Sequence, residues 1–122
     1  IIALGATAAL AAPALAQPRQ PLRVSVWGGS WRDLVNDQIG RRFTRETGIP
    51  VEYVTGGTID RLNRARLARA TPESDITFTT SHIGWLYAND DLFERFDAAR
   101  VPNAQRLVPQ ARISDFHVGT WA

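Results

Sequence analysis

Three parts of this chain repeat one order: a stretch that alternates apolar and polar residues, a few glycines or hydroxyl-bearing residues, and then a helical pattern. The alternating stretches are residues 22–27, 50–54 and 75–79. Strands that alternate with helices pair in parallel through right-handed crossovers, and this order therefore constrains the fold strongly. The sequence predicts an α/β fold with an open, mainly parallel sheet and helices on both faces.

The helical pattern after the first strand has recognisable ends. Ser30 is placed to cap the N-terminus, with Asp33 three residues later as in a capping box. Gly48 is predicted to end the helix in a left-handed conformation, and Pro50 to prevent its continuation. Between these ends, apolar residues recur at helical spacing, and we expect them to form a buried stripe: Trp31, Leu34, Val35, Ile39 and Phe43.

Two further helices are predicted, at residues 59–70 and at 83–87, the second one capped by Thr80 and Ser81. Beyond residue 88 the pattern is weaker, with a helical turn near 103–107 and strand character in 115–122. Because that last stretch has no closing cap or polar tail, we expect a further part of the protein to follow it.

Small and hydroxyl-bearing residues follow each predicted strand. The carboxyl ends of the strands are where open α/β sheets bind their ligands, because glycine admits a ligand close to the backbone and helix starts offer free amide groups. A Gly-Gly pair can also serve only as a tight turn, but two such pairs at one sheet edge favour a binding site. We therefore predict ligand-binding residues in three loops: Trp27, Gly28, Gly29, Ser30; Thr55, Gly56, Gly57, Thr58; Thr80, Ser81 and His82.

Residues 1–16 are apolar or small and carry no charge. This run is shorter than the roughly 20 residues of a membrane-spanning helix, and it ends in a small-x-small pattern at residues 14–16. We expect a signal peptide, truncated at its N-terminus and cleaved before Gln17, with no stable membrane insertion afterwards. A buried apolar helix is the alternative. The remaining residues, 17–122, have the size of one small domain.

Charge and composition limit the classes of partner. All 14 basic residues are arginines, the 12 acidic residues are interspersed, and the formal net charge is +2. The densest basic stretch comprises Arg61, Arg64, Arg66 and Arg69 and carries no interleaved aromatic residues. We therefore expect these arginines to lie on a solvated helix surface, and we expect no nucleic-acid partner. The chain has no cysteine, and its two histidines lack the spacing of a metal site, so we expect neither a metal nor another cofactor.

Several stretches together resemble bacterial extracellular solute-binding proteins of the spermidine/putrescine-binding type. The most specific is the phrase F-x-x-E-T-G-I-x-V within residues 41–53. Trp-Gly-Gly-Ser-Trp after the first strand also matches, as do residues 74–78, 92–97, 101–103 and 116–121. The resemblance implies a two-lobe periplasmic receptor, of which residues 17–122 would be the N-terminal lobe. It also implies a small-molecule solute in the cleft, delivery to the permease of an ABC transporter, and a monomer.

By the same resemblance, the three predicted loops lie at the edge of the cleft, and Trp121 falls where a cleft aromatic residue occurs. Polyamine binders need carboxylates to pair with ammonium groups, because an unpaired buried charge is costly. None of the three loop tips carries Asp or Glu. A polyamine-like solute and another small organic molecule, neutral or anionic, therefore both stay open.

Other functions fit less well. A hydrolase would combine Ser30 or Ser81 with a histidine and an aspartate, but G-x-S-x-G does not occur. A dinucleotide-binding domain would need G-x-G-x-x-G after the first strand and an acid where Thr55 stands. We predict that the protein is not an enzyme, and the remaining alternative to a receptor is an α/β interaction module without a transport role.

Overall fold

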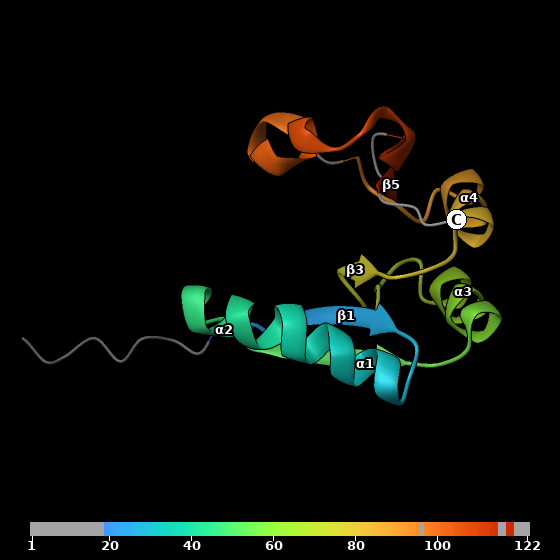
Figure 1. The fold of residues 1–122 in the computed structure, drawn as a ribbon. Coiled ribbons are helices and arrows are strands. Elements are labelled where there is room, and N and C mark those ends of the chain that lie inside the picture. The colour runs from blue at the N-terminus through green and yellow to red at the C-terminus, as the bar shows by residue number, and fades with distance from the viewer. Residues whose placement is uncertain (1–18, 96, 115–116, 119–122) are drawn as a thin grey trace, which may run out of the picture.

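The computed structural model describes residues 19–95, 97–114 and 117–118 (Figure 1). The predicted signal peptide and Trp121 lie outside these residues. In the part of the chain that is described, no helix is both long enough and apolar enough to span a bilayer.

Three parallel strands form the main sheet, in the order β2-β1-β3. Their bounds are Leu22–Val26 for β1, Val51–Thr55 for β2 and Ile76–Thr77 for β3. The predicted α/β fold with an open parallel sheet is confirmed. The third strand is shorter than expected. At its start the Asp75 carboxylate accepts a hydrogen bond from the Arg23 N–H at 2.8 Å, and just after its end the Phe78 carbonyl accepts from the Arg61 side chain at 2.8 Å.

The first crossover is one continuous helical segment of α1 (Ser30–Val35), the π-helical turns η1 (Asn36–Gly40) and α2 (Arg41–Thr47). It ends as predicted at Gly48, which has φ +71° and donates its N–H to Thr44 O. The prediction that Ser30 caps its N-terminus is wrong. Gly29 occupies that position without a side-chain cap, and Asp33 pairs with Arg32 instead, at 2.9 Å.

Helices cover both faces of the sheet, as expected. Val24 and Val26 are buried on one face, and Tyr53, the partner of Val24 in β2, donates from its hydroxyl to Asn36 of η1 on that side. Ser25 is buried on the opposite face, where Arg61 of α3 (Thr58–Leu67) donates to its hydroxyl. Figure 1 shows α1 and α2 running back along β1, with α3 beyond its carboxyl end.

The apolar stripe of the first helix is buried only in part. Val35 is buried, whereas Leu34 and Ile39 are 48% and 55% exposed. The π-helical turns of η1 bond from i to i+5, which changes the angular spacing of side chains. This change accounts for the exposure of Ile39, whereas Leu34 already faces solvent within α1, and Trp31 and Phe43 are half-buried.

A second apolar cluster joins α3 to α4 (Ser81–Asn89). Leu62 meets Ile83 and Tyr87, and Tyr87 stacks on Phe93 with ring centroids 5.0 Å apart. Helix α3 ends three residues earlier than predicted, and α4 extends beyond both ends of the predicted segment. Thr80 is the residue before α4, but its side chain caps no amide there.

Short elements follow α4 in the C-terminal part. Three 3-10 helices are described, namely η2 (Ala98–Arg100), η3 (Pro102–Arg106) and η4 (Pro109–Ala111). The helical turn predicted near 103–107 corresponds to η3. An antiparallel pair of strands comes last, β4 (Arg112–Ser114) and β5 (His117–Val118).

Candidate binding site at the carboxyl edge of the sheet

The order of the strands places a topological switch point beside β1. The first crossover leads from β1 to β2 on one side, and the chain then returns to β3 on the other side. Open α/β sheets bind ligands outside the carboxyl ends of the strands at such a point. In this chain these ends are residues 27–29 after β1 and residues 78–80 after β3, which together we call the switch edge.

Trp27 is held at the switch edge by contacts with two helices. Its Nε1 donates to Thr58 Oγ1 of α3 at 2.8 Å, so that two of the predicted site residues are joined directly. Its ring meets that of Trp31 of α1 edge to face, with centroids 5.9 Å apart. The guanidinium of Arg61 lies 4.9 Å from the centre of the Trp27 ring, within cation–π distance. A half-buried indole in a fixed position can form one wall of a ligand-binding site.

The first Gly-Gly pair is exposed, and its two glycines differ in what they require. Gly29 has φ +63° and ψ −142°, a conformation that favours glycine. Gly28 has no positive φ, and a Cβ there would lie 3.9 Å from Thr55 Cβ, in ordinary contact. The structure therefore brings the loops after β1 and β2 together at Gly28 and Thr55.

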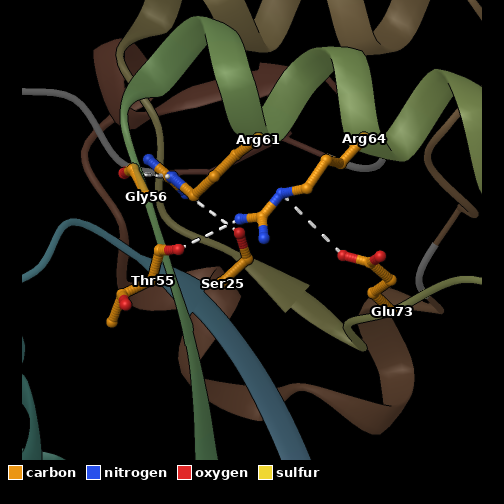
Figure 2. A network of polar contacts seen from close by, with 6 residues as sticks. All are labelled: Ser25, Thr55, Gly56, Arg61, Arg64 and Glu73. Atoms are coloured by element: carbon orange, nitrogen blue, oxygen red, sulfur yellow. Dashed lines mark hydrogen bonds and ion pairs between the residues drawn. The ribbon is translucent and has the colours of Figure 1, made fainter.

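The second Gly-Gly pair has a local packing role. Arg64 donates to Thr55 O at 3.0 Å and Arg61 donates to Gly56 O at 3.1 Å, as Figure 2 shows. A Cβ at Gly56 would lie 2.9 Å from Arg64 Nη2 and 3.2 Å from Arg61 Cγ. Glycine at position 56 lets the two arginine side chains fold over the loop. A Cβ at Gly57 would likewise approach Asp60 Oδ2 to 3.0 Å.

The third loop contributes exposed groups. Ser81 and His82 are exposed at the start of α4, and Ser30 is exposed at the start of α1. His82 Nε2 and Thr80 Oγ1 are 3.5 Å apart, which joins two predicted site residues within one loop.

Arg61 is a site residue that the sequence analysis did not identify. It was expected on a solvated helix surface, but only 3% of it is exposed, and that prediction is wrong for this residue. Its guanidinium donates through Nη1 to Ser25 Oγ at 3.0 Å and to Phe78 O at 2.8 Å, in addition to the bond from Nε to Gly56 O. One side chain thus contacts β1 and the chain just after β2 and β3.

The sequence does contain a signal for this burial. Arg61 directly precedes the buried Leu62 and lies four residues before Ala65, so all three share the face of α3 that turns inward. Burial lowers the pKa of Arg61 from its ordinary value; Tyr87 partly opposes this shift, and the neighbouring Arg64 adds to it. An arginine nevertheless stays charged at neutral pH.

Other kinds of site find less support in the described residues. No group of three or more His, Cys, Asp or Glu among them is arranged to hold a metal ion. An open hollow of about 310 Å³ lies elsewhere, on the helical segment η1–α2, where Arg42 and Glu46 form an ion pair at 2.7 Å. It does not include the strand ends.

Comparison with known proteins gave matches only at the level of structure. No family model and no curated protein sequence matches the chain. A crystal structure from Bordetella parapertussis, described as a candidate extracellular solute-binding protein, is similar with a TM-score of 0.73 and 19% identity over 83% of this chain. An ABC transporter structure from Clostridium perfringens is similar with a TM-score of 0.63 and 24% identity over 75% of this chain.

The chain spans 31% and 28% of the length of these two proteins. One is described as an extracellular solute-binding protein and the other as an ABC transporter. At sequence identities this low, the similarity shows a shared fold alone. The chain has the α/β fold of periplasmic-binding-protein-like lobes, and its length fits a first lobe.

Proposed function

We propose that residues 17–122 are the N-terminal lobe of an extracellular solute-binding protein, which captures a small polar solute between two lobes and delivers it to an ABC-type permease. The observation that carries this proposal is the switch point beside β1, with Trp27 fixed at its edge, in a fold shared with solute-binding proteins. The first Gly-Gly pair and the third loop leave exposed polar groups at the same edge.

The resemblance to the spermidine/putrescine-binding type supports a narrower prediction about the solute. A polyamine would need carboxylates, and none of the loop tips 27–30, 55–58 and 80–82 carries one. Those carboxylates would have to come from the second lobe. We therefore propose a small polar organic solute and treat a polyamine as one member of that class.

Localisation and partners follow from the same proposal. Removal of residues 1–16 would release the protein into the periplasm, where it acts as a monomer on a small-molecule solute and on the permease subunits. No cofactor is needed, because such a receptor changes only the location of its solute.

The test is a thermal-shift screen of the full-length mature protein against polyamines, amino acids, small carboxylates, phosphonates and sugars. Ligand at 100 times its Kd stabilises the native state by about 2.7 kcal/mol, which raises the melting temperature by several degrees. A shift with one class of compound supports the receptor and indicates its solute. If a folded two-lobe protein shows no shift with any class, the interaction module without a transport role is the better account.

A further inference from the structure

Arg61 is a buried cation without a carboxylate partner. Its three hydrogen-bond acceptors, Ser25 Oγ, Phe78 O and Gly56 O, are all neutral. Among the residues that the structure describes, no carboxylate lies within ion-pair distance of it. Its Nη2 is buried and has no hydrogen-bond partner in the same part of the chain. Two N–H groups of a charged side chain are thus left without acceptors.

This arrangement is unfavourable in isolation. Removing a charge from water costs free energy unless it is paired, and carbonyl oxygens and the Trp27 ring compensate only in part. Arg64 lies beside Arg61 and adds a second positive charge, whereas the carboxylate nearest to Arg64 is that of Glu73 at 4.0 Å. Both Arg64 and Glu73 are substantially exposed, so solvent screens that pair. The buried charge at Arg61 therefore stays only partly compensated.

The position of this charge coincides with the candidate site. The guanidinium bonds the carbonyl of Phe78, which begins the β3 side of the switch edge, and it lies against the ring of Trp27 on the β1 side. Figure 2 shows it between the Gly56 loop and Ser25. Thr79 Oγ1, next to Phe78 in the chain, is also buried without a partner among the described residues. One buried polar group without a partner thus belongs to the switch edge, and a second, charged one contacts that edge at Phe78.

We propose, on the basis of the proposed function, that the solute carries an anionic group such as a carboxylate, sulfonate or phosphonate, for which Arg61 supplies the counter-charge. An anion at the switch edge, beside Trp27 and Phe78, lies close to the buried guanidinium and compensates its charge. A cation at the same place is repelled by it, because a charge in a region of low dielectric is weakly screened. The solute class is therefore anionic, and polyamines are disfavoured on this lobe.

The experiment compares matched probes on the full-length mature protein by calorimetry. One set is succinate, succinamide and putrescine, which share four carbons and differ in charge. A second set is ethylphosphonate, ethanesulfonate, propanamide and ethylamine. We expect an anionic member to bind at least tenfold more tightly than its amide and amine counterparts, with an affinity that falls as salt is added.

The outcomes separate this inference from the proposed function. Tighter binding of an amide or an amine would overturn the anionic class and leave the receptor in place. Absence of binding in both sets, and in the broader screen above, would overturn the receptor and the inference together.

Variants test the role of Arg61 itself. We expect Arg61→Met to reduce the preference for the anion over its amide by at least tenfold. The control Arg45→Met, an exposed arginine of α2, should leave it unchanged. The ratio of two affinities within one variant cancels a general loss of folded protein.

If Arg61→Met does not fold, Arg61→Lys tests the same role. It keeps the charge but lacks the planar fork, so it should bind the anion more weakly and still prefer it to the amide. Anion binding as tight as that of the wild type in either variant would refute the role of Arg61.

Discussion

Gly29 adopts a backbone conformation that restricts its position to one residue type. With φ +63° and ψ −142° it lies in a region that side chains with a Cβ rarely occupy, although nothing in the surroundings would touch that Cβ. The glycine is therefore needed for the shape of the chain between β1 and α1. Its neighbour Gly28 carries no such requirement, which makes the two residues a matched pair.

We expect Gly29→Ala to lower the free energy of unfolding by about 1–3 kcal/mol, because the strained conformation must be kept or the loop must move. Gly28→Ala should change it by less than about 1 kcal/mol, since only an ordinary contact with Thr55 is made. Urea unfolding of the full-length protein measures both values. Equal effects of the two substitutions would contradict this account.

At the scale of elements, local patterns predicted the sheet well and the helix surfaces poorly. Strands β1 and β2 and the left-handed Gly48 were predictable, because alternation and glycine at a helix end depend on the neighbouring residues alone. The stripe is buried only in part, because Leu34 faces solvent within α1 and the π-helical turns of η1, which lie against Tyr53, change the side-chain spacing at Ile39. The acceptors of Arg61 likewise include Ser25 and Phe78, which are distant in sequence, so the local pattern indicates only that Arg61 lies on the inward face of α3.

Gly40, in η1, lies under the ring of Tyr53. A Cβ there would be 2.3 Å from the Tyr53 hydroxyl oxygen and 3.1 Å from Asn36 Oδ1, so we expect Gly40→Ala to cost about 1–3 kcal/mol of stability although alanine favours helices. Tyr53→Phe removes the closest of these atoms. In that background the same substitution should cost clearly less, as measured by a double-mutant cycle in urea. Identical costs in both backgrounds would show that Tyr53 is not the obstacle.

Helix α3 offers a test of the second apolar cluster. Leu62 is 1% exposed against Ile83 and Tyr87, whereas Leu67, at the end of the same helix, is 89% exposed. Leu62→Ala should therefore destabilise the protein by about 2–5 kcal/mol, through lost contacts and the cavity that remains. Leu67→Ala should stay within about 0.5 kcal/mol of the wild type. Chemical denaturation with circular dichroism gives both values, and a large loss at Leu67 would mean that another part of the protein covers it.

At the scale of the whole molecule, burial raises the pKa of two tyrosines. Tyr87 and Tyr53 are both shifted upward chiefly by loss of solvent, while nearby arginines partly oppose the shift. An unfolded tyrosine ionises near pH 10, so the native state holds these protons to higher pH than the unfolded chain does. Their contribution to stability is complete below about pH 10 and is lost as pH rises through the native pKa values.

Stability should therefore fall with pH above about 10, by at most about 1.4 kcal/mol per pH unit for each tyrosine. The variant Tyr53→Phe/Tyr87→Phe should show a shallower decline, because two of the groups that titrate are gone. Urea midpoints between pH 8 and pH 11.5 measure the two slopes. A slope that is the same in the variant and the wild type would assign alkaline unfolding to other groups.

The contacts of Arg61 also have a mechanical consequence. One side chain joins Ser25 of β1, Gly56 after β2 and Phe78 after β3, and its ring partner Trp27 is bonded to Thr58 of α3. A force that displaces one of these strand ends is transmitted to the others through the same guanidinium. The three strand ends are therefore coupled at the rim of the sheet, and strain applied at one of its loops is shared with the other two.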